Sequence, residues 1–252
     1  MTVITVEGRA GGGAQELGRI VARELEIDFV DRLILAEIAR RVGSTVGALA
    51  DQEQRVPSMV NRLSQAVQRM LHRSAVAGMG GDPYFGPGIE HLLSRPYSEM
   101  DEPPATTAAE VDEKHFVTTT AEVIRDIAAA DNVVILGRGG AAILKDQPDV
   151  LRVGVVARTE DRIRRVMDRE KMDTAAAGEF IEHSDRAQHR YFERAFNSSP
   201  LDPFLYHFMW NTSDVSIEYA AQVTIDAARE MADKGLKWAG QETPPVAASG
   251  NI

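Results

Sequence analysis

A glycine-rich turn near the N-terminus is the first feature of the sequence that could do chemistry. It runs from Gly8 to Gly13, after the β-branched stretch 2–6, which predicts a short buried strand. From Ala14 onward, apolar residues recur at helical spacing. A strand, a glycine turn and a helix in this order direct backbone N–H groups and the positive end of a helix toward an anion such as phosphate.

The turn departs from the Walker A phosphate-binding loop, which reads GxxxxGK[ST]. Gly8 and Gly13 have the required spacing, but Ala14 stands in place of the lysine and Gln15 in place of the magnesium-binding hydroxyl residue. The residues alone leave two interpretations open. Either the turn binds phosphate, or it is a tight connection between a strand and a helix.

A second glycine-rich turn, Gly137-Arg138-Gly139-Gly140, follows the apolar run 133–136, which is typical of a buried parallel strand. A helix is expected over 141–144. Ligands bind at the carboxyl ends of strands in open α/β sheets, where an arginine between glycines can meet an anion. The alternative is a helix-capping turn with a solvated arginine; together, the two glycine turns favour anion binding.

Two further helices, predicted after a strand at 151–156, each carry arginines along one face. The first follows Thr159, which we expect to cap it, and the second covers about 174–196. Neighbouring acids could neutralise much of this charge, yet arginine is the side chain best suited to bidentate phosphate contacts. The arginines in question are Arg158, Arg162, Arg165 and Arg169 in the first helix, and Arg186, Arg190 and Arg194 in the second.

The other predicted elements alternate in the manner of an α/β domain. A second strand over 27–30 ends at Asp31-Arg32, where Asp31 either contacts a substrate or caps the helix that begins at Arg32. The remaining expected elements are helices over 33–42, after Ser44, over 112–130 and over 217–231, and a last strand over 205–209.

Two regions stand apart from this pattern. Apolar residues from Val56 to Met70 follow a four-three spacing, which predicts an amphipathic helix that packs either on the domain or against a second subunit. Residues 80–112 are rich in proline and glycine and predict a long irregular insertion. The tail, 239–252, is low in apolar content and is expected to be disordered.

Composition excludes several classes of protein. The formal charge of −10 argues against a general nucleic-acid binder, and no apolar run is long enough to span a membrane. The chain contains no cysteine, so disulfides and thiolate metal sites are excluded, in keeping with an expected cytoplasmic location. The histidines show no metal-ligand spacing, and no metal site is predicted from the residues.

The order and spacing of these stretches resemble the cytidylate kinase-like family of P-loop nucleoside monophosphate kinases. The resemblance covers nearly the whole chain except 56–112 and the tail. It rests on ITVEGRAGGG, FVDRLIL, VVILGRGGAAIL, VVARTEDRIRRVMDRE, HSDRAQHRYFERAF and NTSDVSIEYAA. It implies an α/β three-layer P-loop kinase fold in one domain, 1–238, whose five-stranded parallel sheet has a central first strand. Helices flank both faces, with a helical lid at about 158–195 and an inserted helical or irregular segment at about 56–112.

The resemblance also implies roles for individual residues. ATP, with Mg²⁺, and a nucleoside monophosphate such as CMP or dCMP are the implied ligands. The implied ATP phosphate-binding residues are Gly8, Arg9, Gly11, Gly12, Gly13, Ala14, Gln15 and Arg19. The implied acceptor-binding residues are Asp31, Arg32, Gly137, Arg138, Asp185 and Arg190, and the implied catalytic arginines are Arg138, Arg162, Arg165 and Arg186.

The missing lysine leaves three hypotheses open. The first is a phosphotransferase that uses ATP, in which Arg9 or Arg19 replaces the lysine. The second is a nucleotide-binding or interaction protein that keeps the fold without catalysis and could dimerise through the helix at 56–72. The third is that the glycine turn is purely structural and no nucleotide binds.

Overall fold

The computed structural model of the chain describes residues 2–32, 107–130 and 132–234. The expected helices over 33–42 and after Ser44, the seam from Val56 to Met70, most of the insertion and the tail lie outside the described residues. In the described part, no helix is long and apolar enough to cross a membrane.

Five parallel strands form one sheet in the order β2-β3-β1-β4-β5. Their bounds are β1 Val3–Gly8, β2 Asp28–Val30, β3 Val133–Leu136, β4 Val150–Val156 and β5 Phe208–Asn211. Strand β1 lies in the centre, between β3 and β4, which confirms the expected central first strand. The register places Val6 of β1 beside Leu136 of β3, so the two glycine turns that follow these strands leave the sheet at the same edge.

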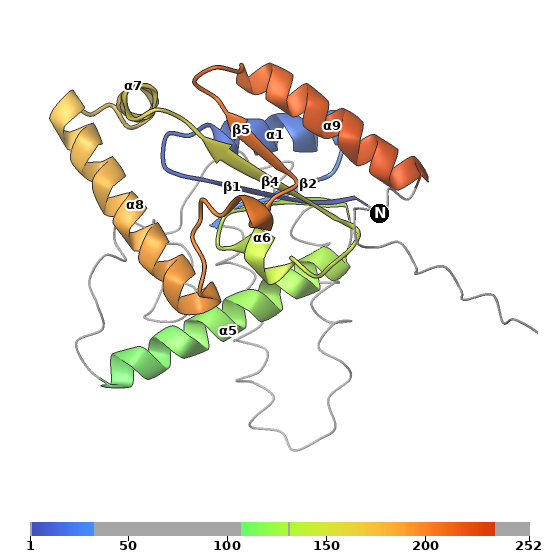
Figure 1. Ribbon diagram of the computed structural model, residues 1–252, viewed down its shortest axis with the longest axis horizontal. Helices are drawn as coiled ribbons and strands as arrows, with labels where there is room; N and C mark the ends of the chain where they lie inside the picture. Colours follow the sequence, from blue (N-terminus) through green and yellow to red (C-terminus); the bar gives the residue numbers. More distant parts are fainter. Residues whose placement is uncertain (1, 33–106, 131, 235–252) are drawn as a thin grey trace, which may run out of the picture.

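Helices cover both faces of the sheet and complete three layers (Figure 1). Helices α1, Ala14–Leu25, and α9, Ile217–Lys234, pack on one face. Helices α5, Thr107–Ala129, α6, Gly140–Ile143, and the C-terminal half of α8, Thr174–Phe196, pack on the other. Helix α7, Thr159–Glu170, forms a small separate apolar cluster with the N-terminal half of α8.

The alternation of side chains along β1 explains both layers. Ile4 and Val6 point toward α1 and α9, whereas Val3 belongs to the opposite apolar cluster. Because successive strand residues face opposite sides, Thr5 and Glu7 share the face of Val3. Glu7 therefore enters the interior at the end of the central strand, where it is only 2% exposed.

Three local predictions were wrong. The last strand is β5, Phe208–Asn211, rather than 205–209, because Pro203–Leu205 forms a 3₁₀ turn whose buried Leu205 packs in the core. Thr159 is the first residue of α7, and Arg158 occupies the cap position without a side-chain cap. The first strand extends through Glu7 and Gly8, because β4 continues to pair with it beyond Val6.

Candidate active site

One cavity lies between the two glycine turns. Eighteen residues line it, drawn from the ends of β1 and β3, the first turn of α1, the tip of β2, the last turn of α7 and one face of α8. Residues from the sequence-based site line it, namely Gly8, Arg9, Gly11, Gly13, Ala14, Gln15, Asp31, Arg32, Gly137 and Arg138. Arg169, one of the arginines expected along the face of the first arginine-bearing helix, also lines it. Residues that the sequence did not single out line it as well, including Glu7, Glu16, Phe180, Ser184 and Gln188.

The backbone of the first glycine turn is held from behind through its carbonyl groups. Arg162 Nε donates to the carbonyl oxygen of Ala10 at 2.8 Å, and Arg165 Nη1 donates to that of Gly11 at 3.2 Å. Thr212 Oγ1 donates to the carbonyl oxygen of Gly12 at 2.7 Å. Since peptide units are planar and trans, the N–H that follows each carbonyl points the opposite way.

Glycine is required at position 11 because the turn passes very close to the backbone of α7. Gly11 has φ +73°, and a Cβ there would lie 2.6 Å from the carbonyl oxygen of Arg162. At the end of the turn, Gly13 caps α1 without a side-chain hydrogen bond. The first N–H groups of α1 have no acceptor within the helix and suit an anion in the cavity.

Three of the predicted catalytic arginines occupy different positions relative to the first glycine turn. Arg162 is only 3% exposed, and its two terminal nitrogens lie 2.9 and 2.6 Å from the two carboxylate oxygens of Asp185. Arg165 also donates to the backbone oxygen of Thr212. Both arginines therefore support the glycine turn here, whereas Arg186 is exposed and lies 3.4 Å from Glu182.

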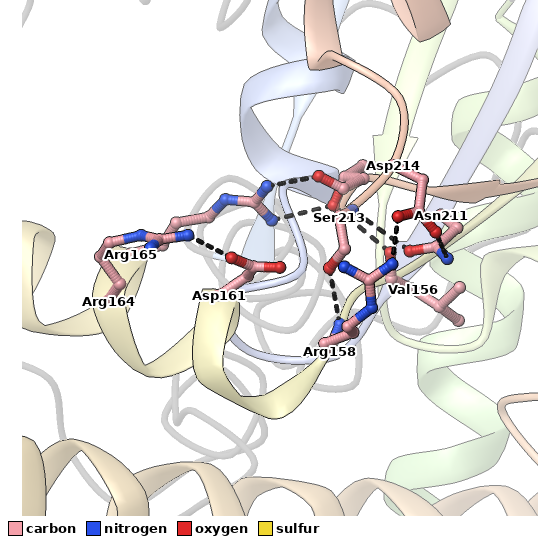
Figure 2. A network of polar contacts seen from close by, with 9 residues as sticks. Val156, Arg158, Asp161, Arg164, Arg165, Asn211, Ser213 and Asp214 are labelled. Carbon is pink, nitrogen blue, oxygen red and sulfur yellow. Dashed lines mark hydrogen bonds and ion pairs between the residues drawn. The ribbon is translucent and has the colours of Figure 1, made fainter.

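The start of α7 is fastened to the connection between β5 and α9, close to the same turn (Figure 2). The N–H of Arg158 donates to Ser213 Oγ at 2.8 Å, and its guanidinium pairs with Asp214. A hydrogen bond from Ser213 lowers the pKa of Asp161, and the nearby charge of Arg164 lowers it further. These contacts hold the helix that carries Arg162 and Arg165.

Arg9 and Arg19 occupy different environments. Arg9 lines the cavity, with Nη1 3.4 Å from Asp185, and its Nε is buried with no hydrogen-bond partner in the described part of the chain. Arg19 is exposed, lies 5.7 Å from the ring centre of Phe29 and does not line the cavity. Of the two predicted substitutes for the lysine, the structure brings only Arg9 to the cavity.

The second glycine turn has an unusual backbone. Gly137, Arg138 and Gly139 all have positive φ angles, +77°, +58° and +71°. A Cβ at Gly139 would lie 2.3 Å from the ring of Phe196 in α8. Arg138 is 2% exposed and lines the cavity, and its carbonyl oxygen accepts a hydrogen bond from Tyr191 at 3.1 Å.

Glu7 connects this turn to α8. Its Oε2 accepts the N–H of Gly139 at 3.0 Å, and its Oε1 accepts Nε2 of Gln188 at 2.9 Å. Burial raises the pKa of Glu7 to about 7, against the opposing effects of these hydrogen bonds and the charge of Arg138. Sequence reasoning missed Glu7, although an acid directly after a β-branched stretch was a visible signal.

A resident metal site is not formed by the described residues. No group of three His, Cys, Asp or Glu side chains there could hold a metal ion. Gln15 offers an amide where a hydroxyl residue would bind magnesium, and the buried carboxylate of Glu7 is already engaged.

Sheet order, glycine turns and cavity together define a kinase-like α/β protein of the P-loop class. The family model of the cytidylate kinase-like family matches residues 3–214, and the chain belongs to this family. This confirms the resemblance inferred from the sequence. The search of curated proteins gave no match.

Solved structures that are similar to this chain have little sequence in common with it. An uncharacterized protein from Eubacterium ventriosum is 15% identical, with a TM-score of 0.58, over 91% of this chain and 99% of that one. Shikimate kinase from Acinetobacter baumannii, in complex with shikimate, is 12% identical, with a TM-score of 0.44, over 91% and 94%. Shikimate kinase from Bacteroides thetaiotaomicron is 13% identical, with a TM-score of 0.41, over 92% and 98%.

Proposed function

We propose that the protein is a phosphotransferase that moves the γ-phosphoryl group of ATP to a nucleoside monophosphate, with CMP or dCMP as the first candidates. One observation carries this proposal. The turns that follow the adjacent parallel strands β1 and β3 line one cavity, and each turn presents an arginine to it, Arg9 and Arg138. Membership of the cytidylate kinase-like family supports the choice of acceptor.

The two turns suit two phosphate groups. The phosphates of ATP would lie on the N–H groups of the first turn and of the start of α1, with Arg9 as the nearby cation. The acceptor phosphate would meet Arg138, with Asp31 and Arg32 at the tip of β2 facing the rest of the nucleotide. Phosphoryl transfer needs little more than in-line positioning and neutralisation of charge, which this arrangement of cations and N–H groups supplies.

A second candidate function is nucleotide binding without turnover. The observation that favours it is Ala14, which leaves the cavity without the lysine that acts on the transferring phosphoryl group. Losing one charge-assisted hydrogen bond of about 1.5–3 kcal/mol would weaken nucleotide binding by roughly ten- to a hundredfold. Such a loss would leave binding measurable.

The deciding experiment is ADP release from MgATP, measured with and without each member of a panel of nucleoside monophosphates. We expect acceptor-dependent ADP from the wild type and its loss in Arg138→Ala. Arg23→Ala is a matched control, because Arg23 lies on the exposed side of α1, outside the cavity. If no monophosphate in the panel causes ADP release while calorimetry still detects MgATP binding, the kinase proposal is wrong and nucleotide binding without turnover is favoured. An unaffected Arg138→Ala would refute the acceptor site.

A further inference from the structure

Glu7 is a buried acid whose position at the cavity calls for a role of its own. A carboxylate in the interior is costly unless hydrogen bonds or cations compensate it. Packing alone does not require an ionisable side chain at the end of β1, because leucine or valine would fill the same space. The contacts of Glu7 therefore indicate what the charge does.

Those contacts join three segments that are distant in the sequence. Glu7 stands at the end of β1, one residue before the first glycine turn begins. Its two oxygens accept from Gly139 in the second turn and from Gln188 in α8, and Gln188 also lies 3.4 Å from the carbonyl oxygen of Gly8. A single carboxylate thus connects both turns and the helix behind them.

Helix α8 contacts the second turn at two further points. The hydroxyl of Tyr191 donates to the carbonyl oxygen of Arg138, and the ring of Phe196 lies against Gly139. Tyr191 and Phe196 pack edge to face, with ring centres 5.6 Å apart. The turn that carries Arg138 is consequently placed by Glu7 from one side and by α8 from the other.

We propose that Glu7 is a positioning residue, which ties the Arg138 turn and helix α8 to the end of β1 and so sets where Arg138 meets the acceptor phosphate. The proposal rests on the proposed function and adds to it the residue that aligns its acceptor side. Its ionised form is the one that accepts both hydrogen bonds and faces Arg138. The charged and titratable groups around it are Arg138, Tyr191 and Tyr206.

The first part of the test compares two variants at Glu7 with a matched control. Glu7→Leu keeps the bulk and removes both acceptors, whereas Glu7→Gln keeps a hydrogen-bonding group and removes the charge. Thr5→Val is the control, since Thr5 is buried on the same face of the same strand, and no partner of its hydroxyl lies in the described part of the chain.

Steady-state kinetics with MgATP and CMP give the functional readout. We expect Glu7→Leu to raise KM for CMP about tenfold or more while KM for ATP changes less than threefold. Glu7→Gln keeps one of the two acceptor oxygens, so it should recover part of that loss and flatten the dependence of kcat/KM for CMP on pH between 6 and 8. A fall in Tm alone, with both KM values and the pH profile unchanged, would show that Glu7 is merely structural.

Hydrogen exchange separates failure of this proposal from failure of the proposed function. If no monophosphate yields ADP with the wild type, the kinase assignment fails. The connection that Glu7 makes between the Arg138 turn and α8 can still be measured by hydrogen exchange with mass spectrometry. Glu7→Leu should then speed amide exchange in the peptide spanning 137–143 and in 184–192, compared with Thr5→Val. Equal exchange rates in the two variants would contradict the proposal that Glu7 holds the Arg138 turn and α8 to the end of β1.

Discussion

Arg162 and Asp185 form a bidentate ion pair behind the first glycine turn, with Nη1 and Nη2 of the arginine 2.9 and 2.6 Å from the two carboxylate oxygens. The same guanidinium donates through Nε to the carbonyl oxygen of Ala10. The pair therefore shapes the turn that faces the cavity. It also satisfies Asp185, which leaves Arg9 with the longer 3.4 Å contact.

This ion pair predicts a large loss of stability when Arg162 is removed. Arg162→Met leaves a mostly buried carboxylate and a backbone oxygen without their main partner, and we expect a loss of about 3 kcal/mol in the free energy of unfolding. Urea unfolding measures it. Arg164→Met is the matched control on the same helix, because its ion pair with Asp161 is at the surface and should contribute much less to stability. Equal losses in the two variants would contradict the assigned role.

A second prediction concerns the cation that replaces the missing lysine. Arg9→Ala should weaken MgATP binding by about ten- to a hundredfold in calorimetry, because a charge-assisted contact to phosphate is lost. Arg19→Ala should leave the affinity within about twofold, since Arg19 stacks on Phe29 outside the cavity. Adding Ala14→Lys to Arg9→Ala should restore much of the affinity. If Arg19→Ala weakens binding instead, the assignment of Arg9 fails.

A third prediction compares Gly139, which packs against α8, with Gly178, which lies inside α8. Gly139→Ala places a Cβ 2.3 Å from the ring of Phe196 at a φ of +71°, and we expect a loss of about 2–4 kcal/mol from strain and overpacking. Gly178→Ala, inside α8, meets no atom within 4 Å and should stabilise the protein by about 0.5–1 kcal/mol. Thermal unfolding of both variants gives the comparison; a tolerated Gly139→Ala would contradict the close contact.

A fourth prediction follows from the pKa of Glu7, which burial raises from 4.5 to about 7. The folded protein then binds a proton more tightly than the unfolded chain. The stability that this group contributes is complete below pH 4.5 and is lost as the pH rises through about 7. Relative to Glu7→Gln, which does not titrate, the wild type should lose about 3 kcal/mol of unfolding free energy across this range. Urea titrations of both proteins between pH 4.5 and 8.5 measure the difference, and a constant difference would contradict the raised pKa.

Much of the fold could be read from local sequence patterns. The run 133–136, the glycine turns and the helix over 174–196 were predicted within a residue or two, because apolar periodicity and glycine report backbone conformation directly. The apolar residues around Leu205 gave a wrong strand boundary, since burial of a 3₁₀ turn leaves the same apolar pattern as a strand. The pattern of apolar residues reports directly which residues are buried, and it reports their secondary structure only indirectly.

The sequence by itself determined the order of the elements, the two glycine turns and the family resemblance. Only the tertiary structure decided which cations face the cavity, placing Arg9 and Arg138 there and Arg162 behind the turn. It also revealed Glu7, whose partners Gly139 and Gln188 lie 132 and 181 residues away along the chain. Glycine turns and periodicity act over a few neighbouring residues, whereas the role of a charged side chain depends on partners that only folding brings within hydrogen-bond distance.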